Sequence, residues 1–535
     1  MELLVRHKII DKSILWDGMT LPRDVNQVLY KMLGKTLARG DKEPVRIKVS
    51  DEWFDVSLKN INNSTVSRTN DALQLRWTPA ILGKKMRELF ITSAPLLIDE
   101  EGKAIKGSRP KLTEYVNIYA QDAHSIIFDC HMKLSEQDYK LCKSNFFLLA
   151  AAKTKPFLIL GGFSGTGKSM KVKELAYLTC PKGELQEGQE PGNYCLVSVK
   201  PNWHDSIELL GYYSNIGKKY VVTDFIKFLV KAMKYPFVPF YVCMDEMNLA
   251  PVEEYFAEYL SVLESRKVVD GQVKSTALVP ANIFFDENTL KGVCLDAEGD
   301  KMIIEELKQN GLCLPQNVVV IGTVNMDDTT NSFSRKVIDR AMTFETKIDS
   351  IESASYFSLA NDALEYKNIA CPERFICDQV RVLDLMKEAT PDFALQEGDN
   401  DLNNAFTAFI NEINKAMGNG KNYDAKDTIG VSPFQVSYRV LNEAVLYYRS
   451  LKVLYPDACT LDKVFADILM MKVLPRIEGE QDRAKKPLEG LQQFVSCRIR
   501  DDEHKKALWA ECADKIEYML KPFGKGGDGF TTFWL

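Results

Sequence analysis

The residues from Gly162 to Ser169 have the types and the spacing of a phosphate-binding loop. They read GFSGTGKS, which fits the pattern G-x-x-x-x-G-K-[ST], and they directly follow the apolar run from Phe157 to Leu160. Glycines let consecutive backbone N–H groups surround an anionic phosphate at the start of a helix. In such a loop the lysine contacts the β and γ phosphates, and the final serine is a ligand of Mg²⁺. The predicted nucleotide-binding residues in this segment are Gly162, Ser164, Gly165, Thr166, Gly167, Lys168 and Ser169.

Hydrolysis of a bound nucleotide requires acidic residues as well, and a second apolar run supplies them. The run from Phe240 to Met244 is followed directly by Asp245 and Glu246. Asp245 would hold the water shell of the Mg²⁺ that Ser169 also binds, and Glu246 would polarise the attacking water as a general base. The alternative interpretation is an acidic pair at the end of a surface strand. We favour the catalytic interpretation because the phosphate-binding pattern lies upstream.

A third apolar run, from Val318 to Val324, ends in a polar residue, Asn325. A polar side chain at this place can orient the attacking water or contact the γ-phosphate. Arg340 follows after about four helical turns and could reach the nucleotide of a neighbouring subunit as an arginine finger. The alternatives are an amide that caps a turn for Asn325 and a salt bridge on a helix surface for Arg340. The predicted catalytic residues are therefore Glu246, Asn325 and Arg340.

These residues require a scaffold that brings the ends of several strands together. Over residues 135–347 short apolar runs alternate with helical patterns, which predicts an α/β domain with a parallel, doubly wound sheet. Over residues 348–535 the apolar spacing is helical, which predicts an α-helical domain. Residues 1–115 mix short alternating runs with turn residues, so a small β-rich or α+β domain is expected there.

One connection in the predicted α/β domain is longer than its neighbours require. Roughly fifty residues separate Arg266 from Pro315, whereas most connections in compact domains have about 4–6 residues. We interpret residues 267–315 as an insertion. In a ring, such an insertion would face the pore or a partner. The alternative is an ordinary surface loop.

Composition and charge exclude several classes of protein. With 535 residues, of which 45% are hydrophobic and 27% charged, the chain is globular and has several domains. Its formal net charge of −6 excludes a polycation that binds nucleic acid along its whole length. The longest apolar runs fall far short of the roughly 20 residues of a membrane helix, and the first residues lack a signal-peptide pattern. We expect a cytoplasmic protein without membrane contact.

The histidines and cysteines give no second metal site. The twelve cysteines include no C-x-x-C pair, and the five histidines have no metal-ligand spacing. Mg²⁺ is therefore the one metal that the sequence predicts, with Ser169 and Asp245 as its protein ligands.

Positive charge is concentrated in the stretch from Lys59 to Arg87. Six basic residues face one acidic residue there, and asparagines, a threonine and a tryptophan lie among them. Basic side chains bind phosphates, and amide or aromatic groups contact bases. The stretch is compatible with DNA binding by residues 1–115, with an ordinary solvated face as the alternative. The basic residues are Lys59, Arg68, Arg76, Lys84, Lys85 and Arg87.

Long blocks of the chain resemble the AAA+ NTPases, in the dynein-related branch that includes the McrB motor subunits of methyl-directed restriction. The resemblance covers roughly residues 140 to 535. It is carried by SVKPNWHDSIELLGYY (198–213), CMDEMNLAPVEEYFAEYLSVLESR (243–266) and VVVIGTVNMDDTTNSFSRKVIDRA (318–341). The segments 436–449, 473–479 and 529–535 are similar to restriction-motor homologues of the LlaJI type.

This resemblance implies an AAA+ core with an α-helical lid, hydrolysis of ATP or GTP with Mg²⁺, and a homo-oligomer that is a hexameric ring. It further implies a separately encoded McrC-like nuclease partner and a role in restriction and antiphage defence. Arg439 matches the place of the sensor-two residue, which contacts the nucleotide in the family.

Two positions depart from the McrB pattern. The signature Met-Asn-Thr-Ala-Asp-Arg is replaced here by Val324-Asn325-Met326-Asp327-Asp328-Thr329, which lacks the arginine. Arg340 is followed by Ala341 where McrB carries adjacent arginines, so a single finger is expected. McrB uses GTP and most of the branch uses ATP, and the sequence leaves both nucleotides open.

Two other functions are compatible with the same motifs. A MoxR-like remodelling chaperone would use residues 1–115 to hold a protein client. A nucleotide-gated binding module would hydrolyse too slowly to be a motor. Hydrolysis that DNA stimulates favours the restriction motor, and hydrolysis that a protein client stimulates favours the chaperone.

Overall fold

A computed structural model gives the fold of the chain. It describes residues 2–49, 52–61, 71–90, 93–99, 103, 105, 114–131, 136–181, 185–187, 190–216, 219–269, 272–296, 300–325, 331–346, 369, 372–383, 396–397, 400–419, 432–455, 458–500 and 502–534. The chain forms two compact units. The first comprises residues 1–143, 369–374 and 389–394, and the second comprises residues 144–368, 375–388 and 395–535.

The first unit is built around a seven-stranded sheet with the strand order β1-β6-β7-β3-β4-β5-β2. All neighbouring strands are antiparallel except β3 and β7, which are parallel. The strands are β1 (Glu2–Ile9), β2 (Gly18–Thr20), β3 (Lys42–Val49), β4 (Glu52–Asn60), β5 (Leu73–Arg76), β6 (Tyr115–Ala120) and β7 (Ser125–His131). The helices are α1 (Lys12–Trp16), α2 (Val25–Leu33), η1 (Pro79–Gly83), α3 (Lys84–Leu89), α4 (Ala94–Leu97) and α5 (Glu136–Cys142).

Alternation along β3 and β4 determines which face of this sheet is buried. Val45, Ile47 and Val49 point into a core that also contains apolar residues of α1, α2 and α3, so the helices cover this inner face. The unit extends to Lys143 and not to residue 115, where the sequence predicted its end. The reason is that β6 and β7 follow the glycine- and proline-containing stretch after residue 101 and complete the sheet beside β1 and β3.

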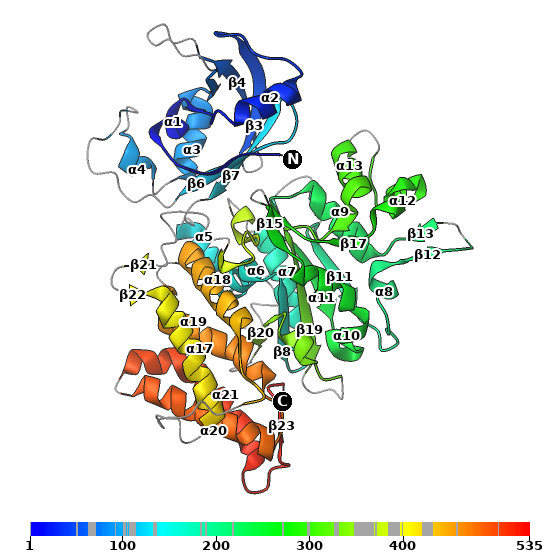
Figure 1. Cartoon of the computed structure of the whole chain (residues 1–535), viewed down its shortest axis with the longest axis vertical. Coiled ribbons are helices and arrows are strands. Elements are labelled where there is room, and N and C mark those ends of the chain that lie inside the picture. Colours follow the sequence, from blue (N-terminus) through cyan, green and yellow to red (C-terminus); the bar gives the residue numbers. More distant parts are fainter. Residues whose placement is uncertain are drawn as a thin grey trace, which may run out of the picture. The chain divides into compact units, whose positions relative to one another are not determined.

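The second unit contains a five-stranded sheet with the order β11-β14-β19-β8-β20, in which every neighbouring pair is parallel. Its strands are β8 (Phe157–Gly162), β11 (Tyr194–Ser198), β14 (Phe240–Asp245), β19 (Val318–Asn325) and β20 (Met342–Glu345). The predicted parallel sheet of an α/β fold is therefore present (Figure 1). The three apolar runs described in the sequence analysis are strands β8, β14 and β19.

Helices cover both faces of this sheet, which explains why β8 is buried at every position. One face packs against apolar residues of α9, α10, α11 and α14. Helices α6 and α7 contact the sheet through β8, and α7 also contacts β14 and β19. The helices are α6 (Phe146–Thr154), α7 (Lys168–Thr179), α8 (Ile207–Leu210), α9 (Asp224–Lys234), η2 (Met247–Leu249), α10 (Val252–Tyr255), α11 (Ala257–Glu264) and α14 (Arg335–Ile338).

The insertion at residues 267–315 has its own secondary structure. It begins with a hairpin of β15 and β16. Strand β17 then pairs with β18, and three short helices lie between these two strands in the sequence. Its elements are β15 (Lys267–Val269), β16 (Gln272–Lys274), β17 (Ala277–Val279), η3 (Ala281–Phe285), α12 (Glu287–Gly292), α13 (Lys301–Asn310) and β18 (Leu312–Cys313). Two further hairpins are β9 (Gln186–Glu187) with β10 (Glu190–Pro191) and β12 (Tyr212–Ser214) with β13 (Lys219–Val221).

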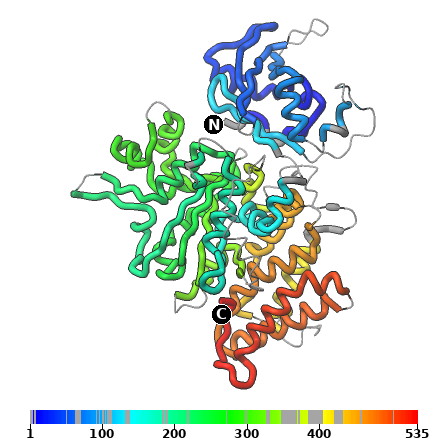
Figure 2. The backbone as a smooth tube through the Cα atoms, turned by 180° about the vertical axis from the view of Figure 1, so that it is seen from behind, coloured from blue at the N-terminus to red at the C-terminus, as the bar shows by residue number. Residues whose placement is uncertain are grey.

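The C-terminal part is helical, as the sequence predicted, and the helices gather beside one another in Figure 2. The predicted boundary between residues 347 and 348 lies outside the described residues. Two elements of this helical region contact the α/β part of the second unit. Helix α18 packs on α6, and η8 packs on β20. The elements are η4 (Pro372–Phe375), β21 (Gln396–Glu397), β22 (Asn400–Asp401), α17 (Leu402–Asn419), α18 (Tyr438–Leu454), α19 (Leu461–Ile468), η8 (Leu469–Val473), η9 (Leu474–Arg476), β23 (Gly479–Glu480), α20 (Gln481–Ile499), α21 (Glu503–Leu520), η10 (Lys521–Phe523) and β24 (Phe530–Thr531).

The aromatic tail of the chain is docked. β24 pairs with β23, the Thr531 hydroxyl donates to the Met519 carbonyl, and the Trp534 ring lies 5.4 Å from the ring of Phe333. Among the residues that the structure describes, no helix is both long and apolar enough to cross a membrane.

Candidate functional site

The predicted phosphate-binding loop connects the carboxyl end of β8 to the first turn of α7. Gly165 and Gly167 have φ angles of 78° and 75°, which glycine adopts without a steric cost. The buried ammonium of Lys168 donates to the carbonyls of Gly162 and Phe163 at 2.9 and 2.7 Å. The loop therefore encloses a cation at the amino end of a 12-residue helix, where a helix favours anions.

Thr346, a residue that the sequence did not single out, holds the start of this loop. Its N–H and its hydroxyl both donate to the Gly161 carbonyl, at 2.7 and 3.0 Å, and its hydroxyl oxygen lies 3.1 Å from that of Thr166. A Cβ atom at Gly162 would lie 2.2 Å from this hydroxyl, so only glycine fits at that position. Nothing in the sequence pointed to Thr346, because the short strand before it, β20, was not among the predicted apolar runs.

The acidic pair lies beside the loop because β14 and β8 flank β19 in the same sheet. The Ser169 hydroxyl donates to Oδ1 of Asp245 at 2.5 Å, which joins the two predicted metal ligands. The same Oδ1 accepts a hydrogen bond at 2.8 Å from the hydroxyl of Thr323, which in turn accepts the Glu246 N–H at 3.0 Å. Thr323 is buried and was missed in the sequence, where it is the polar exception in an apolar run.

Glu246 and Asn325 also meet at this edge. Asn325 is level with Gly162 in the register of β19 and β8, and its Nδ2 donates to Oε1 of Glu246 at 3.0 Å. Glu246 has φ 51° and ψ 51°, a left-handed conformation that costs a non-glycine residue about 1–3 kcal/mol. Such strain persists where the surroundings determine the conformation, and here the Thr323 and Asn325 contacts do so.

Arg340 lies at the opposite edge of the sheet. It precedes β20, whose first residue, Met342, pairs with Leu158 near the start of β8. Leu158 and Gly162 are four residue steps apart, about 13 Å at 3.3 Å per residue, and Arg340 lies two residues before Met342, further from the loop. Arg340 donates to the Lys336 carbonyl at 2.8 Å, and its Nε lies 3.8 Å from the Glu264 carboxylate. Within one chain it does not reach the phosphate loop.

Arg439 occupies this same opposite edge, which corrects the sensor-two interpretation; a helical pair with Glu443, four residues on, was the alternative that the sequence offered. Its guanidinium donates to Glu264 at 2.6 Å, so it is neither at the nucleotide loop nor paired with Glu443. Glu443 instead binds the ammonium groups of Lys155 and Lys472, at 2.5 and 2.7 Å. The predicted sensor-two role failed because the helix that carries Arg439 packs against α6 rather than over the loop.

The basic cluster predicted in the first unit is largely neutralised. Arg76 pairs with Asp17 at 2.5 Å, Lys85 with Glu52 at 2.7 Å, and Lys84 lies 3.8 Å from Glu88. Arg87 donates to the Leu15 carbonyl and lies over the Trp16 ring. Asn60 and Trp77 are buried. Arg68 and its neighbours between residues 62 and 70 lie outside the described residues.

A second group of cations, which includes Lys59 of that cluster, is exposed or half-buried on the outer face of β3 and β4. Lys42, Arg46 and Lys48 alternate with the buried residues of β3, and Lys59 does so on β4. The guanidinium of Arg46 lies 4.4 Å from the centre of the Trp53 ring, which is 39% exposed. Among the described residues Lys42, Lys48 and Lys59 have no ion-pair partner. The one acidic residue on these two strands that faces outward is Asp55, opposite Arg46.

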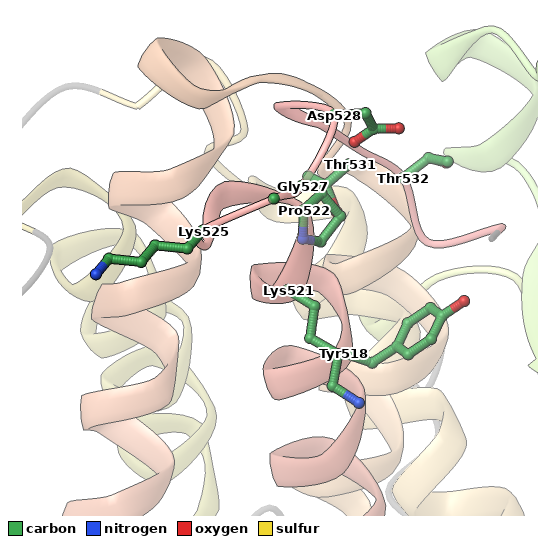
Figure 3. Close-up of a pocket in the computed structure, with 9 residues that line it drawn as sticks. Tyr518, Lys521, Pro522, Lys525, Gly527, Asp528, Thr531 and Thr532 are labelled. Carbon is green, nitrogen blue, oxygen red and sulfur yellow. The ribbon is translucent and has the colours of Figure 1, made fainter.

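A hollow of about 490 Å³ lies elsewhere, in the helical region. It is lined by residues of α21 and of the glycine-rich turn that follows, among them Tyr518, Lys521 and Lys525. In Figure 3 the side chains of Lys521 and Lys525 extend away from each other. No predicted site residue lines this hollow, and its charges do not converge.

Comparison with known proteins gives a family match in the helical region and a match to a solved structure. A family model described as "Domain of unknown function (DUF8727)" matches residues 383–527, in the helical region. No curated protein matches the chain. The crystal structure of a "putative ATPase" from Cytophaga hutchinsonii is similar over 63% of this chain and 84% of its own, with 12% identity and a TM-score of 0.37. A similarity this low carries no argument about function, which has to come from the site itself.

Proposed function

We propose that the chain is a nucleoside triphosphatase that hydrolyses ATP or GTP. The observation that carries this proposal is the meeting of three groups at the carboxyl edge of one parallel sheet. They are the Lys168 ammonium inside its glycine loop, the Ser169–Asp245 pair and the Asn325–Glu246 pair. Ligands of open α/β sheets bind at this edge, and a cation at the amino end of a helix favours a polyphosphate.

Magnesium fits the Ser169–Asp245 pair. Both residues offer oxygen atoms, 2.5 Å apart, and Mg²⁺ prefers oxygen ligands and is usually held by one or two protein groups together with water and phosphate. Ser169 and Asp245 would hold the ion, and Thr323 would orient the Asp245 carboxylate. When bound, the ion neutralises the charge that develops on the phosphates.

The side chains of this edge divide the work of hydrolysis. The Lys168 ammonium, which donates to two neutral carbonyls, gains a charged acceptor when phosphate enters the loop. Oε1 of Glu246 is held by Asn325, which leaves Oε2 to accept the proton of the attacking water. The fixed backbone of Glu246 keeps this carboxylate in place before the nucleotide arrives.

Arg340 would complete the site of a neighbouring subunit. It lies beyond the opposite end of β8, more than about 13 Å from its own phosphate loop, so it can contribute only across an interface. We propose a McrB-like motor that works as a hexameric ring with a separately encoded McrC-like nuclease. This assembly and its role in restriction and antiphage defence rest on the sequence resemblance of residues 140 to 535.

Nucleotide retention and steady-state turnover test the enzymatic proposal. Glu246→Gln should keep labelled nucleotide and lower turnover by about 10²–10⁴-fold, because it removes the general base. Arg340→Ala should lower turnover by about 10³-fold with nucleotide retained. Arg500→Ala, on an exposed arginine of the helical region, is the matched control. The proposal fails if neither labelled ATP nor labelled GTP is retained with Mg²⁺.

For the first unit we propose that the outer face of β3 and β4 binds duplex DNA. This face carries four positive charges and one negative charge, that of Asp55, and a row of phosphates would complement it. The four cations are Lys42, Arg46, Lys48 and Lys59. The exposed Trp53 ring lies among these charges. This face replaces the Lys59–Arg87 stretch as the candidate surface, because most of the described basic side chains of that stretch are paired within the unit.

Fluorescence anisotropy with labelled duplex DNA at several salt concentrations tests this face. Substituting alanine at Lys42, Lys48 and Lys59 should weaken binding and reduce the slope of log K against log salt by about 3. The matched control substitutes Lys12, Lys31 and Lys84, which lie on the helices of the other face. Equal losses in both variants would contradict the assignment, and hydrolysis that a protein client stimulates, without any effect of DNA, would favour a remodelling chaperone.

A further inference from the structure

The segment that carries Arg340 is bound to the C-terminal helices by a fully buried lysine. Lys472 lies in η8, and its Nζ donates to the carbonyls of Ile338, Asp339 and Ala341 at 3.5, 3.1 and 2.6 Å. These carbonyls are those of the turn between α14 and β20, on both sides of Arg340. A single ammonium therefore fixes the backbone from which the Arg340 side chain extends.

Two arginine contacts attach the same segment at other points. Arg476, in η9, pairs with the Asp339 carboxylate at 2.5 Å. Arg335, in α14, donates to the Pro433 carbonyl at 2.9 Å, and its guanidinium lies over the Phe434 ring. The backbone of residues 335–341 is thus connected to the helical region at both ends and in the middle.

The ionised side chains around Lys472 are buried, and their opposite charges neutralise one another. Glu443 is buried between Lys155 and Lys472. Burial alone would raise the pKa of Glu443, but the two ammonium groups hold it below its ordinary value. Lys155 also lies 3.5 Å from Glu264, the carboxylate that Arg340 and Arg439 share. Removing one partner from such a network leaves an uncompensated buried charge.

Packing alone does not require this arrangement. Well-packed apolar residues often replace a buried ion pair without loss of stability, so the buried ion pairs around Lys472 are better explained by a positional role than by stability. Here the three carbonyls that Lys472 binds are backbone groups of one turn, and each contact restricts the direction of that turn. The side chain that gains from this restriction is Arg340, because its guanidinium has to meet a target on another molecule.

We propose that Lys472 and Arg476 are positioning residues for Arg340, so that the C-terminal helices set where its guanidinium points. This inference rests on the proposed function, in which Arg340 completes a neighbouring site. Neither residue contacts the phosphate loop of its own chain; both contact the turn before β20. A displacement of η8 and η9 would move this turn with them. Since a misplacement of about 1 Å can cost about 100-fold in rate, the helical region would control hydrolysis in the adjacent subunit.

Turnover and nucleotide affinity of three full-length variants test the proposal. Lys472→Met should lower kcat by about 100-fold with little change in nucleotide affinity. Because this variant leaves Glu443 with one partner and can unfold, Asp339→Asn serves as the second variant. It removes only the half-buried acceptor of Arg476 and should lower kcat by about tenfold. Lys463→Met, which breaks the ion pair with Asp467 in α19 of the same helical region, is the control and should keep wild-type turnover.

Mixing subunits separates a positional role in trans from a structural role. In a 1:1 mixture of Lys472→Met or Asp339→Asn with Glu246→Gln, about one quarter of the interfaces join an intact Glu246 site to an intact Arg340 turn, so turnover should recover toward that fraction. Arg340→Ala mixed with Glu246→Gln is the reference. Recovery with Arg340→Ala but not with the other two would overturn the positioning role. No recovery with Arg340→Ala would instead overturn the trans role of Arg340 in the proposed function.

Discussion

A methyl group at Gly322 should uncouple nucleotide binding from hydrolysis. Gly322 lies in the buried strand β19, next to Thr323, and an added Cβ would be 2.4 Å from Sδ, 3.2 Å from Cβ and 3.3 Å from Cγ of Met247. Met247 is fully buried and directly follows Glu246. The sulfur must retreat by about 1 Å to restore an ordinary contact of about 3.5 Å.

The magnitude follows from this displacement. Overpacking a dense core costs about 1–3 kcal/mol, and the flexible Met247 side chain places Gly322→Ala toward the lower end. A shift of about 1 Å at the neighbouring Glu246 would lower kcat by about 10–100-fold. The phosphate loop follows β8, which this methyl does not touch, so nucleotide affinity should change by less than about threefold.

The assay combines single-turnover hydrolysis, equilibrium nucleotide binding and thermal melting for Gly322→Ala, Met247→Ala and the double variant. In the double variant the added methyl partly fills the space that the methionine leaves, so the loss of stability should be smaller than the sum of the two single losses. Wild-type turnover in Gly322→Ala, or strictly additive losses in the double variant, would refute the coupling between this strand and Glu246.

Three further predictions concern other parts of the second unit. Thr323→Val leaves Asp245 and the Glu246 N–H without their shared partner, so the apparent affinity for Mg²⁺, measured by titration of turnover, should fall by about tenfold or more. Burial raises the pKa of Asp467 to about 6 from 3.8, so between these values the folded chain binds more protons than the unfolded chain and the free energy of unfolding falls as the pH rises. Asp467→Asn should remove about 3 kcal/mol of this pH dependence in urea titrations near pH 4 and pH 7, and an unchanged difference would contradict the assignment. Trp534→Ala removes the ring that packs on Phe333 and should cost about 2 kcal/mol, seen as a melting temperature lowered by several degrees.

The features that the sequence predicted are those that a continuous stretch of chain contains. The glycine loop needs only its own eight residues and the strand before it, and Asp245 and Glu246 end a strand whose apolar run is visible by itself. The proximity of Ser169 to Asp245 could be expected because the carboxyl ends of parallel strands share one edge.

Residues whose role depends on pairing between distant segments were not predictable in this way. Thr346 holds the loop only because β20 lies beside β8, and Thr323 reaches Asp245 only because β19 lies beside β14. Arg439 has a plausible helical partner four residues away, but the tertiary fold gives it Glu264 instead. The end of the first unit was misplaced for the same reason, since β6 and β7 find their partners far upstream in the chain.

The parallel register of β8 and β20 has a consequence for symmetry. Because the two strands are parallel, the glycine loop lies at the carboxyl end of β8 and the Arg340 turn lies at the amino end of β20, on opposite edges of the sheet. If Arg340 completes a neighbouring site as proposed, the subunits must be arranged so that the Arg340 turn of one copy faces the glycine loop of another. In the proposed head-to-tail ring each copy offers one Arg340 turn and receives another, so each further copy would add one complete site.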